Sequence, residues 1–387
     1  MRIIGREARK AFRKKILLIV VNALLLIAFI VCLAASASIK NTLRSQQAAT
    51  AWAGQSGERF AQVSAFLPDG ASFDENDIRS LRETIDRALI EASIAEDEGR
   101  TLYTDAWSAE SEVNIVGGRG SSSAQAFSVG GDFFLFHPLY LRDGSYLSRN
   151  DLMKDRIVLD EELAWRLFGA IDLAGLEVLI NDRPHIIAGV ISREDDFAST
   201  KAYTGGAGLF MSYESLSELS ESSVEIICYE IVLPDPITGF AFNTITDLFP
   251  NKNAAIVENS ARYTLSSVVG IIGAYGSRSM RNDGIIYPYW ENAARYTEDW
   301  LALLRLLSLI FIVFPFICGV IYGIKGIRFS LRRSKAAIGK KVEERDEREA
   351  DNYRQTHSEE AVIPNAEEII REVLEEKEAE TAAEPHN

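Results

Sequence analysis

Two long apolar stretches divide the chain. Residues 16–37 contain no charged side chain, and residues 306–324 contain none either, although Pro315 lies in the middle of the second stretch. A helix that rises about 1.5 Å per residue needs about 20 apolar residues to cross a hydrocarbon layer about 30 Å thick. The pattern predicts two transmembrane helices, at residues 16–37 and 300–324, on either side of a large region at residues 38–299.

The region between the stretches has the hydrophobic periods of a mixed α/β domain. Ile78, Leu81, Ile85 and Leu89 recur every three or four residues, which is the spacing of an amphipathic helix. After residue 101 the apolar positions alternate and turn residues become frequent, which is typical of strands. The predicted strands are residues 112–116, 126–130, 156–160, 177–180, 185–191, 209–212, 226–232 and 254–257, and further helices are predicted at 161–168 and 239–248. We expect an α+β fold with a mixed sheet.

The charged flanks of the two stretches predict the topology. Residues 1–15 carry seven Lys or Arg side chains and one Glu, and residues 325–341 carry seven with no acid. Basic flanks stay in the cytoplasm. We therefore expect a plasma-membrane protein with two spans, both termini in the cytoplasm and the main domain outside the cell membrane. Residues 1–15 also fit an amphipathic helix on the cytoplasmic surface, or serve only as a basic flank.

The first stretch admits a second interpretation. A basic start, an apolar run and the sequence Ala35-Ser36-Ala37 also resemble a signal peptide with its cleavage site. The apolar run is longer than the 7 to 15 residues, roughly, that such signals use, which favours a retained anchor. Either interpretation exports the middle of the chain.

Aromatic residues gather just before the second stretch. Tyr287, Tyr289, Trp290, Tyr296 and Trp300 fall within 14 residues. Tyr and Trp are enriched where a helix meets the membrane surface, so the group fits an outer interfacial belt. Burial in the core of the domain is an equally good interpretation for the first three.

The last part of the chain, residues 342–387, is acidic and differs from the rest. Residues 342–364 are charged and poor in apolar side chains, which predicts disorder. A short helix is predicted near residues 366–379. Its apolar strip is a candidate docking surface for a cytoplasmic partner, and a solvated tail is the alternative. The strip consists of Ile369, Ile370, Val373 and Leu374.

Charge and cysteine content restrict what the exported domain binds and how it is stabilised. Outside the two basic flanks and the tail, the chain retains a net negative charge, which argues against nucleic acid as a partner. Membrane lipid can contact the basic flanks. Cys228 is the only cysteine between the two stretches, so no disulfide forms within the domain and a packed core must stabilise it.

The sequence offers few residues for chemistry. The four histidines have no spacing typical of a zinc site, and no nucleophile motif occurs. Residues 117–123 (GGRGSSS) lack the pattern of a phosphate-binding loop and fit a hairpin loop better. We therefore predict no catalytic residue, no cofactor and no metal site. Any ATP-driven step must use an ATPase on another chain.

One segment carries a family resemblance. Residues 129–194 contain a phenylalanine-rich stretch, a turn at residues 144–148, the sequence LAWRLFGAIDLAG at residues 163–175, and two strands that end in AGVI at residues 188–191. This order resembles the MacB-like periplasmic core domain family of bacterial ABC transporter permeases, of the MacB or FtsX type. The positions that carry the pattern are Gly144, Phe168, Gly169, Asp172, Gly175 and Gly189. The resemblance assigns none of them a catalytic role.

The resemblance implies a non-catalytic membrane subunit of an ABC-type transport or mechanotransmission assembly. Its exported domain would bind a partner or relay motion, and its partners would be a separate ABC ATPase, a full permease subunit, or further copies in a homo-oligomer. Members of the family usually carry a three-span permease core after the domain, and here one span and a charged tail follow. A stand-alone binding or sensing protein that signals through the tail is the alternative, and an envelope enzyme fits the residues least well.

Overall fold

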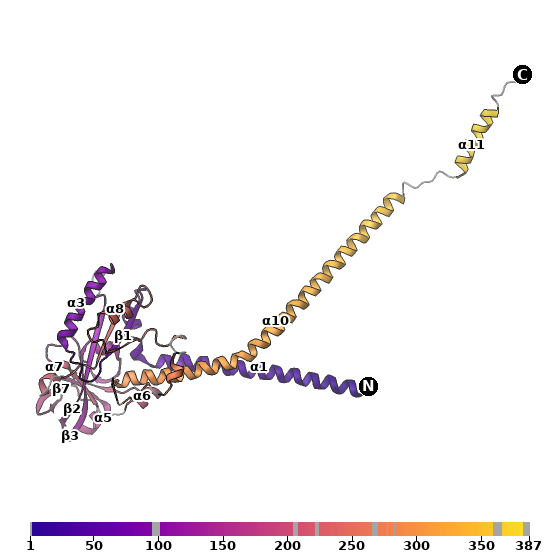
Figure 1. Cartoon of the computed structure of the whole chain (residues 1–387). Helices are drawn as coiled ribbons and strands as arrows, with labels where there is room; N and C mark the ends of the chain where they lie inside the picture. The colour runs from indigo at the N-terminus through magenta and orange to yellow at the C-terminus, as the bar shows by residue number, and fades with distance from the viewer. Residues whose placement is uncertain are drawn as a thin grey trace. The chain divides into compact units, whose positions relative to one another are not determined.

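The computed structural model describes residues 2–94, 101–203, 208–220, 224–264, 270–276, 278–281, 283–358 and 366–381 (Figure 1). The chain divides into two compact units, residues 1–312 and 313–387. The helices are α1 (Arg2–Thr42), η1 (Arg44–Gln46), α2 (Ala48–Ala53), α3 (Glu75–Glu91), α4 (Phe133–Phe136), α5 (Glu161–Leu167), α6 (Phe197–Ala202), α7 (Tyr213–Leu219), α8 (Phe240–Leu248), η2 (Ile272–Ala274), α10 (Tyr289–Ser358) and α11 (Ala366–Thr381). The strands are β1 (Phe60–Phe66), β2 (Thr104–Gly117), β3 (Gly120–Gly131), β4 (Tyr140–Gly144), β5 (Arg156–Asp160), β6 (Glu177–Ile180), β7 (Arg183–Ser192), β8 (Gly208–Ser212), β9 (Cys228–Pro234) and β10 (Ala255–Glu258).

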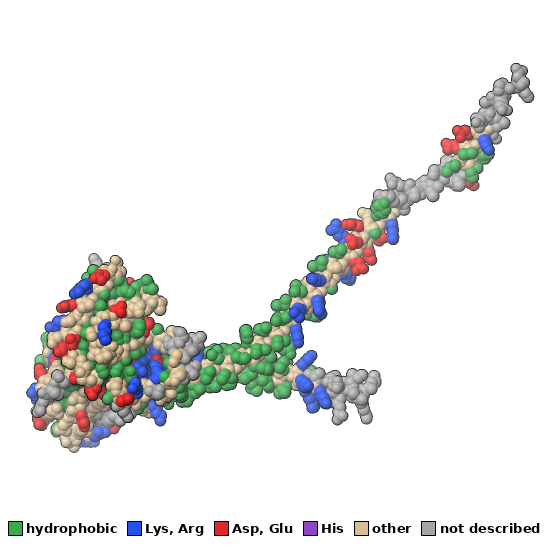
Figure 2. Space-filling model, viewed as in Figure 1, with side chains coloured by type: hydrophobic (Ala, Val, Ile, Leu, Met, Phe, Trp, Pro, Cys, Tyr) green, Lys and Arg blue, Asp and Glu red, His purple; other side chains and the backbone are tan. Residues whose placement is uncertain are grey.

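The two apolar stretches lie in α1 and α10, and both helices are long and apolar enough to cross a membrane. Figure 2 shows hydrophobic side chains along the middle of α1 and Lys and Arg side chains near its N-terminal end. The second helix begins at Tyr289, before the expected start at residue 300. Its first turns belong to the domain, because they are buried against the sheet.

The ten strands of the described residues form one mixed sheet. The order is β10-β1-β9-β2-β3-β8-β5-β7-β4, and β6 pairs with both β2 and β7. That double pairing closes β2, β3, β8, β5, β7 and β6 into a small barrel. The pairs β3–β8 and β5–β7 are parallel and the others antiparallel. The prediction of a mixed α/β domain between two apolar helices is confirmed, and the barrel is a feature that the sequence did not indicate.

Two strands were predicted too short, and one strand of the structure was not predicted. The strands expected at residues 112–116 and 126–130 are parts of β2 and β3, which pair over their whole length and turn at Gly117–Gly120, inside the predicted hairpin loop. Their Ser, Glu and Gly residues have weak strand propensity, so the pairing partners decide the length. The strand β1 was not predicted, because all seven of its residues are buried and its apolar and polar positions show no solvent-facing alternation.

Three apolar clusters fill the domain. In one, α3 and α8 cover one face of β1, β9 and β2, and the four predicted residues Ile78, Leu81, Ile85 and Leu89 of α3 are all buried there. A second fills the barrel, closed by α5. A third lies on the opposite face of β1 and β9, where α2, α4 and the start of α10 pack. The domain therefore has two helical layers on the open part of its sheet.

The described residues of the tail are helical. The helix α10 continues to Ser358, and the remaining residues 359–364 of the segment lie outside the described part. Ion pairs one turn apart join Lys340 to Glu344 and Arg345 to Glu349, and such pairs stabilise a solvated helix. The short helix predicted near residues 366–379 is α11.

Candidate functional site

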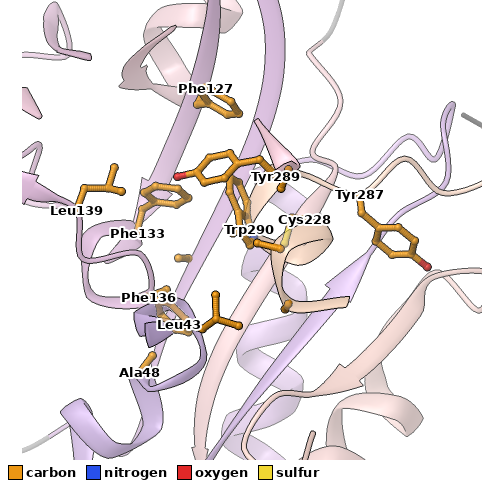
Figure 3. Packing of buried hydrophobic residues seen from close by; sticks show 14 of the residues in the cluster. Leu43, Ala48, Phe127, Phe133, Phe136, Leu139, Cys228, Tyr287, Tyr289 and Trp290 are labelled. Carbon is orange, nitrogen blue, oxygen red and sulfur yellow. The ribbon is translucent and has the colours of Figure 1, made fainter. Parts of the chain in front are cut away.

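The first turns of α10 are buried in the domain. Trp290 is 2% exposed, and its ring lies 5.6 Å from that of Phe133 and 4.4 Å from that of His137. Tyr289 contacts Phe127 edge to face at a ring distance of 5.7 Å. Figure 3 shows Trp290 between Phe133 and Cys228, with Tyr289 directed toward Phe127. Aromatic contacts of this kind fix the orientation of the helix start.

This packing decides between the two interpretations of the aromatic group. Tyr287, Tyr289 and Trp290 are core residues, 8%, 6% and 2% exposed, and the belt interpretation was wrong for them. Tyr296 is half-buried, and Trp300 is 36% exposed one turn further along α10. Only these last two retain the exposure that an interfacial position requires.

A buried cluster of charges lies one turn beyond the aromatic residues. The guanidinium of Arg262 is 1% exposed and donates to Glu291, to Glu298 Oε1 at 2.7 Å and to Gln46 Oε1 at 3.0 Å. Arg295 donates to Glu291 Oε1 at 2.6 Å. Glu291 and Glu298 belong to α10 and Gln46 to η1, directly after α1. One arginine therefore joins the segment that leaves the first apolar helix to the helix that contains the second.

The electrostatics of Arg262 follow from this arrangement. Burial alone would lower the pKa of its guanidinium, but the carboxylates of Glu291 and Glu298 outweigh burial and raise the pKa. Buried charges are costly unless they are paired and hydrogen-bonded. Each acid pairs with Arg262 and with a second arginine, Arg295 for Glu291 and Arg278 for Glu298, while Glu291 Oε2 has no hydrogen-bond partner among the described residues. Both acids lie on α10, so the ion pairs favour one depth and one rotation of that helix.

A second polar group links the sheet to the same segments. Gln62, in β1, donates to the carbonyl of Ser45 at 2.8 Å and accepts from the backbone N–H of Ala48 at 3.1 Å. Glu230, in β9, accepts from Ser64 Oγ at 2.7 Å and pairs with His137 Nε2. All these side chains are buried. We call the Arg262 cluster and this polar group together the junction.

The junction joins the sheet to the first turns of α10 and to the segment after α1. Its carboxylates are engaged by arginine, serine or histidine. Within the described residues, no group of three or more His, Cys, Asp or Glu side chains is placed to hold a metal ion. Sequence reasoning missed these residues, because charges 29 and 36 positions apart give no local signal.

Comparison with known proteins identifies the domain. The sequence profile of the MacB-like periplasmic core domain matches residues 17–242, which is more than half of the chain. The chain belongs to this family. The match includes the first apolar stretch and ends before Arg262, so the charge cluster lies outside the matched region. A search of curated proteins gives no match.

Three solved structures are similar to about half of the chain. The periplasmic region of MacB from Actinobacillus actinomycetemcomitans is 18% identical, with a TM-score of 0.39 over 52% of this chain and 89% of that chain. The extracellular domain of the noncanonic ABC-type transporter YknZ from Gram-positive bacteria is 15% identical, with a TM-score of 0.35 over 52% and 99%. A domain of a putative permease protein from Porphyromonas gingivalis is 14% identical, with a TM-score of 0.30 over 55% and 97%.

Two glycines of the MacB-like pattern face each other. Gly144 of β4 pairs with Gly189 of β7 and has a φ of +72°, a conformation that favours glycine. A Cβ at Gly144 would overlap the carbonyl oxygen of Ala188, and one at Gly189 would lie 2.6 Å from the carbonyl oxygen of Asp143. Both positions therefore need glycine for close approach of the two strands.

The other pattern residues surround the end of α5. Phe168 follows α5 and lies against Gly117 and Gly118 of the β2–β3 turn. Gly169 has a φ of +72° directly after the helix, and Gly175 donates its N–H to the carbonyl of Ile187 at 2.8 Å.

Asp172 is exposed and makes no side-chain hydrogen bond within the described part of the chain. Asp143, which the pattern did not single out, instead accepts from Ala174 N at 2.9 Å and Leu173 N at 2.8 Å, and these hydrogen bonds lower its pKa. The turn between α5 and β6 is therefore organised by Asp143.

The predicted docking strip lies on α11, in the second unit. Ile369, Ile370, Val373 and Leu374 are 48%, 59%, 53% and 56% exposed. Residues three and four apart share one side of a helix, so the four side chains form one apolar strip in contact with solvent. Docking of a partner there stays a prediction.

Proposed function

We propose that this chain is a non-catalytic membrane subunit of an ABC-type assembly of the MacB or FtsX kind, and that its exported domain relays motion to its membrane helices. The family is a family of periplasmic domains of ABC transporter permeases. The observation that supports relay is the Arg262 cluster. It engages α10 and the segment after α1 at the same point, so displacement of the sheet moves both together.

The continuity of α10 supports the same proposal. The helix begins in the core of the domain at Tyr289 and runs to Ser358, so the apolar stretch lies within the same helix. Helical hydrogen bonds resist extension, so axial displacement of the buried helix start is conducted along the first turns of α10. Pro315, within the apolar stretch, lacks the N–H for one of these hydrogen bonds. With both basic flanks in the cytoplasm, the direction of relay is across the membrane, between the exported domain and a cytoplasmic ATPase on another chain.

The first test is co-purification. The full chain, extracted from its native membranes in mild detergent, should bring with it an ABC ATPase or a full permease subunit, identified by mass spectrometry. A preparation in which neither is enriched over a control membrane protein would contradict the proposed assembly.

The second test addresses relay in the purified assembly. Addition of ATP should change hydrogen exchange of the backbone in β1 and η1 of the exported domain. Arg262→Met should abolish this change, because α10 and η1 lose their common partner. The matched control is Arg183→Met, at an exposed arginine on the barrel. An ATP response that survives in Arg262→Met would show that the junction does not carry the motion.

A second candidate function rests on α11. Its exposed strip of Ile369, Ile370, Val373 and Leu374 fits a sensor that reports to a cytoplasmic partner through the tail. Deletion of residues 342–387 should then abolish the output and leave membrane insertion intact. Unchanged output after deletion would favour the relay proposal alone.

A further inference from the structure

A cavity of about 260 Å³ lies between the outer wall of the barrel and the start of α10. The barrel contributes residues of β2, β3, β5, β7 and β8. The opposite side is formed by the end of α6, by Met280 and Arg281, and by residues 286–289 and 292. The pattern of family residues does not include this cavity, and the junction described above does not use it.

Aromatic rings form much of the cavity wall. Phe127 and Phe210 stack at a ring distance of 5.3 Å on the barrel side. Tyr203 and Tyr289 stack at 4.2 Å on the other side, and Tyr287 also lines the cavity. A site lined by aromatic rings on two sides suits a ligand with an apolar body. Ring faces also attract cations, and the guanidinium groups of Arg193 and Arg295 already lie over the rings of Tyr203 (4.9 Å) and Tyr287 (3.8 Å).

One carboxyl group in this wall has no counter-ion. Glu110 of β2 accepts a hydrogen bond from Gln125 Nε2 at 2.6 Å, and within the described residues no Lys, Arg or His lies within ion-pair distance of it. Burial raises the pKa of Glu110 to about 7, although the hydrogen bond from Gln125 opposes this shift. Glu110 is therefore a half-buried carboxyl group without an ion-pair partner among the described residues.

The other charged groups of the cavity are already paired. Asp160 accepts from Arg193 Nε at 3.0 Å and from the backbone N–H of Leu163 at 2.7 Å. At the rim, Arg281 lies 3.4 Å from Asp283. Among the charged side chains that line the cavity, Glu110 is the one that forms no ion pair with a described residue.

We propose that this cavity binds a small organic ammonium ion with an apolar body. The positive charge pairs with the Glu110 carboxylate, and the body lies against Phe127, Phe210 and the tyrosine rings. Binding supplies the counter-ion that the fold omits, so it is accompanied by loss of the Glu110 proton near neutral pH. This proposal is independent of the relay function and survives if that function fails.

The test uses the full chain in detergent micelles and isothermal titration calorimetry at pH 8. The probe is benzyltrimethylammonium, and phenylacetate is the anion of similar size. Saturable binding of the cation and none of the anion is expected. Below pH 7 the affinity for the cation should fall by up to about tenfold per pH unit, because protons compete for Glu110.

Two variants test the assignment to this cavity. Glu110→Gln keeps the acceptor for Gln125 and should weaken cation binding by about tenfold or more. Phe210→Leu keeps apolar volume, removes a ring and should weaken binding by about threefold. The matched control is Glu112→Gln, because Glu112 is exposed and lies on the same face of β2, two residues further along. This variant should bind the cation with the affinity of the wild type.

Three results would overturn the proposal. They are the absence of saturable cation binding to the wild-type chain, equal affinity of the wild type and Glu110→Gln, and binding of phenylacetate as strong as that of the cation. An equal loss of affinity in Glu110→Gln and Glu112→Gln would also overturn it, because that result indicates a general effect of surface charge.

Discussion

The two faces of β1 and β9 are both buried, yet they differ in the side chains that they carry. Toward α3 and α8 the strands present only apolar and aromatic side chains, among them Val63, Tyr229 and Ile231. Toward α10 they present apolar side chains such as Phe66 and Val232 and, in addition, Gln62, Ser64 and Glu230, each at most 3% exposed. Apolar contacts tolerate small shifts, whereas buried hydrogen bonds and ion pairs require one geometry. The polar contacts that require one geometry therefore lie on the face that packs against α10.

The largest effect is expected on the polar side. Arg262→Met removes one of two arginine partners from Glu291 and from Glu298, which keep Arg295 and Arg278. Two buried charge-assisted hydrogen bonds are lost, so the free energy of unfolding should fall by about 3–5 kcal/mol, as measured by chemical denaturation in micelles. Adding Glu291→Gln and Glu298→Gln should recover part of the loss, because the buried carboxylates are removed although Arg278 and Arg295 then lose their partners. If Arg262→Met unfolds like the wild type, the cluster does not stabilise the junction.

A comparable loss of stability is expected on the apolar side, but the loosened helices should be α3 and α8. Ile231→Ala removes a fully buried side chain between the sheet and the α3–α8 layer and should cost about 2–5 kcal/mol. Hydrogen exchange should increase in α3 and α8 and leave the first turns of α10 unchanged. Equal loosening of both layers would remove the distinction between the two faces.

These expectations show how unevenly the sequence predicted the molecule. The helix α3 was predicted from Ile78, Leu81, Ile85 and Leu89, because one of its faces is buried and the other is solvated. The strand β1 has no solvated face, so its sequence lacks the alternation of apolar and polar residues that predicts a strand. The charge cluster was hidden because Glu291, Arg295 and Glu298 look like an exposed helix face. Their spacing of four and three residues beside a run of buried aromatics is the signal that was available.

A smaller effect on stability is expected at Glu110 of β2, which lines the cavity. Its folded pKa of about 7 lies above the usual value, so the contribution to stability is complete below pH 4.5 and is lost as pH rises through 7. Glu110→Gln should therefore be about 2 kcal/mol more stable than the wild type at pH 8, and the two should converge at pH 4. Thermal unfolding at both pH values measures this, and a gain that persists at pH 4 would contradict the ionisation argument.

The smallest effect is expected in the charged part of α10. Glu344→Gln and Glu349→Gln remove ion pairs one turn apart, and each should cost about 0.3–0.5 kcal/mol of helix stability. Circular dichroism of a peptide of residues 325–358 in low and high salt provides the measurement. Salt should narrow the difference between wild type and variant, since exposed pairs are screened. Identical helicity at low salt would show that propensity alone maintains the helix.

The closed barrel also affects how neighbouring molecules meet. Closure leaves β10 and β4 as the two outer strands of the sheet among the described residues, and they are four and five residues long. The pairing of β4 shifts register between Leu141 and Asp143. Short and irregular outer strands discourage extension of a sheet from one molecule into the next. Neither outer strand of the described sheet therefore offers a long, regular edge to which a strand of a neighbouring molecule could add.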